Sequence, residues 1–128
     1  MPAILAYLLH LATAVAMVMA FFVLYTRITP WDEVALIRQG NRAAALSLGG
    51  TLIGFSVTIA SALTHTDDYY EFAGWSALAM LVQVLVYVVA TRMLRVSKDQ
   101  IEADNTGFGG LLGAISLSIG LVNAGSIS

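Results

Sequence analysis

The distribution of charge along this chain constrains its fold more than any other feature. Every charged side chain falls in one of three windows, residues 27–42, 67–71 and 92–104. These windows leave four charge-free stretches of 20 to 26 residues: 1–26, 43–66, 72–91 and 105–128. A helix needs about 20 apolar residues to cross a hydrocarbon core roughly 30 Å thick. Each stretch is therefore long enough to span a membrane as a helix.

The composition indicates the same class. Apolar residues make up 59% of the chain and charged residues 11%, whereas a soluble domain carries about 25% charged residues. This excludes an ordinary soluble globule and a nucleic-acid binder with a basic surface. We predict an all-α integral membrane protein with a single transmembrane domain over 1–128. Its four spans are expected at about 3–26, 43–64, 72–94 and 107–127.

The six basic residues predict how the chain is oriented. All of them lie in or beside the two connections at 27–42 and 92–104, and none lies in the acidic loop 65–71. Basic residues near helix ends stay on the cytoplasmic side of a membrane. We therefore expect a multi-pass membrane protein with both basic connections in the cytoplasm and both termini extracytoplasmic. The first span lacks the positive segment of a secretory signal, so we expect it to be retained.

Each connection is predicted to hold a short helix that lies at the membrane interface. In the first connection, Thr29 is expected to cap the helix N-terminus and Gly40 to follow its C-terminus. An apolar stripe is expected to face the membrane, with Trp31 at headgroup depth. The apolar stripe consists of Trp31, Val34 and Ile37. The opposite, polar side consists of Asp32, Glu33, Arg38 and Gln39.

The two connections also predict an internal repeat. A shift of 64 positions places Ile37 on Ile101 and Asn41 on Asn105, each pair just before a charge-free helix. We interpret residues 1–65 and 66–128 as two copies of one unit: membrane helix, interfacial helix, membrane helix. Each copy crosses the membrane twice, so the copies are parallel repeats related by an axis along the membrane normal.

These motifs resemble the YjfL-type bacterial inner-membrane family, domain of unknown function 350. The resemblance covers nearly the whole chain, and its most specific parts are Gly40-Asn41, Asp104-Asn105 and the ending at residues 120–124. It implies a bacterial inner-membrane protein with tandem copies of one unit, and it implies no established biochemical activity. Asp104 stands where the second motif of the family often has glycine.

Small residues follow one side of the second and fourth spans. Such faces let helix backbones approach closely in lipid, and the alternative is a path lined by backbone and hydroxyl groups. The candidate packing or pore-lining residues are Gly49, Gly50, Gly54, Ser56, Gly109, Gly113, Ser116, Gly120 and Asn123.

Five further polar residues have both a structural and a functional interpretation. Asn41 and Asn105 either cap the helices that follow them or form a polar ring at a pore mouth. Gln83 and Tyr87 share one face of the third span, where they either bond to neighbouring helices or line a conduit. His10 is either a packed interfacial side chain or a titrating group within the membrane.

The remaining chemistry is limited. The chain has no cysteine, no phosphate-binding or hydrolase motif, and no carboxylate within a predicted span,. The acidic loop lacks the spacing of a calcium site. We therefore expect no enzyme activity, no metal, no cofactor and no nucleic-acid partner.

Two functions remain open. One is an oligomeric membrane assembly or partner protein, with a dimer favoured, packed through the small-residue faces of the second and fourth spans. The assembly would dock a cytoplasmic or membrane partner protein. The alternative is an oligomeric channel or small transporter in which the same two spans line the path.

Overall fold

The computed structural model describes residues 2–93 and 97–127. Within these ranges the chain is helical and contains no strand, so the predicted all-α class is confirmed. Four of the helices are long and apolar enough to cross a membrane. In chain order the elements are α1 (Ala3–Ile28), α2 (Glu33–Arg38), α3 (Arg42–His65), α4 (Tyr69–Met93), α5 (Ser97–Glu102) and α6 (Thr106–Ile127).

The long helices differ in their bounds from the predicted spans by a few residues. The largest difference is at α4, which begins at Tyr69 rather than at 72. The aromatic side chains after the acidic loop thus already belong to the helix. The predicted end of that span at 94 lies outside the described residues.

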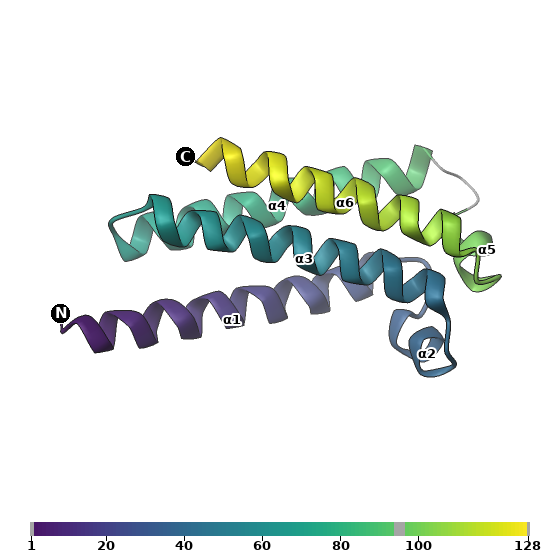
Figure 1. Cartoon of the computed structure of the whole chain (residues 1–128), viewed down its shortest axis with the longest axis horizontal. Helices are drawn as coiled ribbons and strands as arrows, with labels where there is room; N and C mark the ends of the chain where they lie inside the picture. The colour runs from purple at the N-terminus through teal and green to yellow at the C-terminus, as the bar shows by residue number, and fades with distance from the viewer. Residues whose placement is uncertain (1, 94–96, 128) are drawn as a thin grey trace.

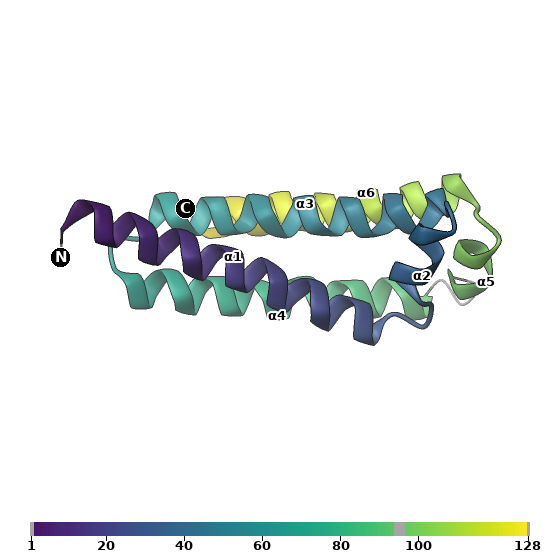
Figure 2. The same ribbon diagram turned by 90° about the horizontal axis from the view of Figure 1, so that it is seen from below.

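The four long helices lie along one axis. Both chain termini and the turn between α3 and α4 are at one end, here called the terminal end (Figure 1). The short helices α2 and α5 are at the opposite end, here called the connection end. α3 and α6 run side by side in the same direction, while α1 crosses α4 obliquely (Figure 2).

The α3–α6 contact is the centre of the structure, and glycine makes it possible. A Cβ atom built on Gly50 would lie 2.4 Å from the Gly113 carbonyl oxygen, and one on Gly120 would lie 2.3 Å from the Gly54 oxygen. Real Cβ atoms do not approach backbone this closely. The helices therefore touch backbone to backbone along most of their length, with further contacts at Gly54, Gly109 and Gly113.

Neighbouring side chains donate hydrogen bonds to one line of α6 carbonyls. The Gln83 amide of α4 donates to the Ser116 oxygen at 2.8 Å, and the Thr58 hydroxyl of α3 donates to the Gly120 oxygen at 2.9 Å. The Ser61 hydroxyl donates to the Ala124 oxygen at 2.6 Å. Since lipid offers no alternative partner, such bonds between helices contribute about 0.6 kcal/mol each, and up to about 2.

α1 packs far less closely than α3. It is the longest helix, yet Ala14, Phe21 and Tyr25 are its only buried residues. Phe21 stacks on Phe55 of α3 with ring centroids 4.4 Å apart. Most of the α1 surface is therefore available to lipid or to another protein.

Neighbouring glycines in α3 give a direct test of the backbone contact. We expect Gly50→Ala to destabilise the protein by about 1–3 kcal/mol, because its methyl group meets the Gly113 backbone,. Gly49→Ala is the matched control, since a methyl group there meets no atom within 4 Å. Alanine should be neutral at this control site, or favourable by up to about 1 kcal/mol. Reversible unfolding in mixed detergent measures the free energy of unfolding of both variants. Equal stabilities of the two variants would contradict the α3–α6 contact.

Candidate functional site: a buried polar cluster near α2

The short helix α2 buries one residue that its sequence predicts to be exposed, while Asp32, Arg38 and Gln39 are exposed as expected. Asp32, rather than Thr29, is its N-cap, with its carboxylate accepting from the Ala35 amide at 3.2 Å. Thr29 instead ends α1 in an extended conformation, as expected for a residue that precedes proline,. Consequently Glu33 points into the protein and is 1% exposed, whereas Val34 is 40% exposed. The predicted exposed position of Glu33 on the polar side of α2 is therefore wrong, whereas the exposed Val34 agrees with a stripe that faces the membrane.

Trp31 is also buried within the protein, at 3% exposure, and its position at headgroup depth stays a prediction. Its indole nitrogen has no hydrogen-bond partner in the described part of the chain. Neither Glu33 carboxyl oxygen has one there either. An unpaired buried carboxylate costs several kcal/mol, so the neutral form of Glu33 is favoured.

Burial raises the pKa of Glu33 to about 7. The Trp31 indole and the Tyr25 hydroxyl lie close enough to lower the pKa of this carboxyl in part. Neither forms a hydrogen bond of ordinary geometry with it, so burial is the dominant cause,.

Three hydroxyl groups from three different helices form a cluster, of which those of Tyr25 and Tyr87 lie close to Glu33. The Tyr25 hydroxyl of α1 lies 3.0 Å from the Ser47 hydroxyl of α3. The Tyr25 ring packs on the Tyr87 ring of α4, with centroids 4.6 Å apart. The Tyr87 hydroxyl is buried and has no partner among the described residues. We call Tyr25, Ser47 and Tyr87 the hydroxyl cluster.

Polar side chains continue from the hydroxyl cluster along one face of α4. Gln83 lies one turn from Tyr87, and its side-chain oxygen is buried without a partner in the described chain. Ser76 lies two further turns toward the terminal end, and its buried hydroxyl is equally without a partner there. The predicted Gln83–Tyr87 face thus lies inside the bundle. Only the Gln83 amide nitrogen is engaged, by the Ser116 carbonyl.

Asn41 and Asn105 cap the helices that follow them. The Asn41 side-chain oxygen accepts from the Ala44 amide at 2.8 Å, and the Asn105 oxygen accepts from the Phe108 amide at 3.1 Å. Asn41 also donates to the Ile101 carbonyl at 2.7 Å, which ties α3 to the opposite connection.

The two connections end with the same backbone geometry, 64 positions apart. The Asn41 amide bonds to the Leu36 carbonyl at 2.9 Å, and the Asn105 amide bonds to the Gln100 carbonyl at 3.0 Å. The residue before each asparagine has a positive φ, 85° at Gly40 and 58° at Asp104. This is a Schellman ending in both cases. The descent of the chain from two copies of one unit stays a prediction.

Asp104 adds a contact that glycine could not make. One of its carboxylate oxygens accepts from the Arg42 and Ala43 amides at 2.8 and 2.9 Å. These amides belong to the unsatisfied first turn of α3, where negative charge is favourable. The α5–α6 connection therefore anchors the start of α3.

His10 and Asn123 lie toward the terminal end and away from the hydroxyl cluster. The His10 ring donates to the Ala6 carbonyl at 2.7 Å and packs against Tyr69 and Phe72 of α4. Asn123 donates to the Ala79 carbonyl of α4 at 3.1 Å. Each side chain therefore has a packing partner in the bundle.

The predicted small-residue set divides between two faces. The α3–α6 contact brings together Gly50, Gly54, Gly109, Gly113, Ser116 and Gly120. Gly49 borders open space, and Ser56 is exposed on another side of α3. These two residues therefore do not take part in the contact. α3 carries small residues on both sides, and only the tertiary structure selects one of them.

Sequence reasoning missed Glu33, Ser47 and Thr51 as interior polar groups. Ser47 and Thr51 are four residues apart and both fully buried, a spacing that could have indicated one polar face. Glu33 gave no such signal. The described residues contain no group of three or more His, Cys, Asp or Glu side chains that could hold a metal ion.

Substitutions of Asp104 separate its two roles. Asp104→Gly removes both bonds to α3 but accepts the positive φ, so we expect a loss of about 1 kcal/mol. Asp104→Ala should lose about 1 kcal/mol more, because alanine disfavours this φ. In detergent unfolding, we expect stability to decrease in the order wild type, Asp104→Gly, Asp104→Ala. Hydrogen exchange at the Arg42 and Ala43 amides should rise in both variants, and unchanged exchange would contradict the anchoring role.

Comparison with known proteins places the chain in a family. The family model described as Domain of Unknown Function (DUF350) matches residues 1–127. The chain is similar to UPF0719 inner membrane protein YjfL of Escherichia coli (strain K12), with 31% identity over 97% of this chain and 94% of the relative. It is also similar to UPF0719 transmembrane protein YshE of Bacillus subtilis (strain 168), with 24% identity over 92% and 90%. No solved structure matches significantly. The chain is thus a membrane protein of the DUF350 family.

Proposed function

We propose that this protein is a non-enzymatic subunit of an oligomeric assembly in the bacterial inner membrane, and that its simplest form is a dimer. The observation that carries the proposal is a face of α3 that has no partner among the described residues of the chain. On this face Ala45, Ser56 and Ala60 are exposed, and Gly49 borders open space. We call these four residues the outer α3 face.

Small residues on an exposed membrane face favour contact with another helix over contact with lipid. They let two backbones approach, and a serine hydroxyl can bond across the interface. The same kind of residues holds α3 against α6 inside this chain. The outer α3 face could accept a second helix in the same way.

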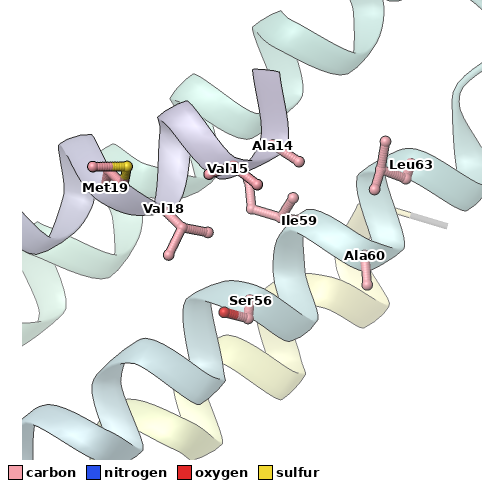
Figure 3. Close-up of a pocket in the computed structure, with 8 residues that line it drawn as sticks. All are labelled: Ala14, Val15, Val18, Met19, Ser56, Ile59, Ala60 and Leu63. Atoms are coloured by element: carbon pink, nitrogen blue, oxygen red, sulfur yellow. The ribbon is translucent and has the colours of Figure 1, made fainter. Parts of the chain in front are cut away.

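An apolar groove of about 290 Å³ continues this face toward α1 (Figure 3). Its floor includes Ser56 and Ala60 of α3, and α1 forms its other wall with Ala14, Val15, Val18 and Met19. The loose packing of α1 leaves the groove open. A helix from a second copy would cover both the groove and the outer α3 face.

We further propose that the connection end faces the cytoplasm and that both termini are extracytoplasmic. The basic residues of the chain belong to the connection end, and the acidic turn before α4 belongs to the terminal end. This distribution supports the assignment because basic residues are retained on the cytoplasmic side. A cytoplasmic partner protein would then dock against α2 and α5.

Gly49→Leu tests the assembly. We expect it to weaken self-association at least tenfold, which corresponds to about 1.4 kcal/mol, because its side chain fills the outer α3 face. Gly74→Leu of α4 is the matched control, since it also borders open space. Single-molecule photobleaching in liposomes across a range of protein-to-lipid ratios measures the dimer fraction. A chain that stays monomeric at every ratio would contradict the proposal.

The second candidate function is a channel or small transporter. The observation in its favour is the line of unpartnered buried polar atoms on Tyr87, Gln83 and Ser76 of α4. The backbone contact between α3 and α6 leaves no room for a path between these two helices. Within one copy a conduit would therefore follow α4, and α3 and α6 would line a path only between copies.

Ser76→Ala discriminates the two functions. It removes a buried hydroxyl that has no partner among the described residues, so a purely structural role predicts equal or higher stability,. A conduit predicts lost flux of protons or small ions into liposomes at unchanged assembly. Flux in the wild-type protein that Ser76→Ala abolishes would favour the channel. The absence of wild-type flux would reject it.

A further inference from the structure

Glu33 has a chemical situation that the assembly function does not use. It is a carboxyl group buried at a helix junction, with both oxygens unpartnered in the described chain. A side chain placed only for packing would be apolar, because a buried polar group without a partner is destabilising. The Trp31 indole and the Tyr25 hydroxyl lie close to Glu33 but form no bond of ordinary geometry with it, so the carboxyl keeps unused hydrogen-bonding capacity.

The groups that face Glu33 do not neutralise a carboxylate. The turn before α2 presents the Trp31 indole, α1 the Tyr25 hydroxyl and α4 the Tyr87 hydroxyl. The uncharged Ser47 hydroxyl of α3 lies beside Tyr25. Among the described residues, no lysine or arginine shifts the pKa of this carboxyl. The nearby basic side chains are exposed instead: Arg27, Arg38, Arg42 and Arg92.

The size of the site limits what can bind. None of the three main hollows on the described chain is lined by Glu33. A metal ion would need several further oxygen ligands around it, and the described residues hold no cluster of acidic or histidine side chains for one. A proton needs no such space.

A hollow of about 440 Å³ offers a route from the connection end. Tyr87 is part of its lining, together with Pro30, Thr91 and Arg92. Tyr87 also faces Glu33 across the hydroxyl cluster. The hollow therefore ends against Tyr87, whose hydroxyl is closed to solvent, so proton exchange with the hollow needs a small movement of this side chain.

We infer that Glu33 is a proton-binding site of this protein, which exchanges its proton with the connection end through the hydroxyl cluster. The step is simple protonation: a hydronium ion gives its proton to a Glu33 carboxylate oxygen and leaves as water. The proton fills the role of the missing partner, because the neutral carboxyl is both a donor and an acceptor. The inference is independent of the oligomeric state.

The titration range follows from the environment of the carboxyl. Because burial raises its pKa to about 7, Glu33 binds its proton below neutral pH and releases it above. The folded state binds more protons than the unfolded state between the ordinary value of 4.5 and about 7,. The stability of the protein therefore falls as pH rises through this window.

Trp31 reports on the site directly. The chain has two tryptophans, so Trp75→Phe leaves the buried Trp31 indole near Glu33 as the only one. In the full chain in nanodiscs, we expect Trp31 emission to change with a midpoint near pH 7 when scanned from about pH 5 to 9. Glu33→Gln should abolish the change. Glu102→Gln, which removes an exposed carboxyl of α5, should leave it intact.

A second test, carboxyl NMR, uses the wild-type protein. The chain has three glutamates, Glu33, Glu71 and Glu102. With ¹³C-labelled glutamate, carboxyl NMR should show a signal that titrates near pH 7. The absence of such a signal, or an emission change that persists in Glu33→Gln, would overturn the inference. Histidine titration does not imitate the signal, because His10 and His65 lie toward the terminal end.

Discussion

The structure depends on the direct backbone contact between α3 and α6. In lipid no hydrophobic effect drives helices together, so close packing and hydrogen bonds must hold a bundle. Glycines at Gly50, Gly113 and Gly120 allow that packing. Because the two helices run in the same direction, their first turns meet at the connection end. This meeting lets Asn41 bond to the α5 backbone and Asp104 bond to the first turn of α3.

A second constraint follows from the same environment, since the hydrocarbon core supplies no hydrogen-bond partner. The bundle meets it by aiming Gln83, Thr58 and Ser61 at successive turns of α6 carbonyls. The buried polar atoms that lack a hydrogen-bond partner are not spread evenly over the bundle. Those among the described residues lie in α4 or at the junction with α2. Buried polar atoms without hydrogen-bond partners concentrate at the functional sites of proteins. This region is therefore where the function of the protein is best sought.

Much of this architecture could be predicted from the sequence, because one physical rule fixed it. Charges are excluded from the hydrocarbon core, so the charge windows delimit the spans to within a few residues. The packing face could not be predicted in the same way. Gly49 and Gly50 are adjacent and chemically identical, and α3 has small residues on two sides. Only the position of α6 decides that Gly50 is in the contact and Gly49 is not.

Glu33 was missed for a different physical reason. A helix of six residues is less than two turns long, so its periodicity cannot establish which side is buried,. The turn from Thr29 to Asp32 sets the rotation of α2, and that turn is held by tertiary contacts such as the burial of Trp31.

The same turn explains why the state of Glu33 can matter to the whole bundle. α2 is joined to α1 through Thr29 and to α3 through Gly40 and Asn41. Asn41 in turn holds the Ile101 carbonyl of the opposite connection. A carboxylate at Glu33 favours water, and a movement of α2 toward water would bend the chain at these two junctions. Because one junction carries the bond to Ile101, such a movement would strain both connections.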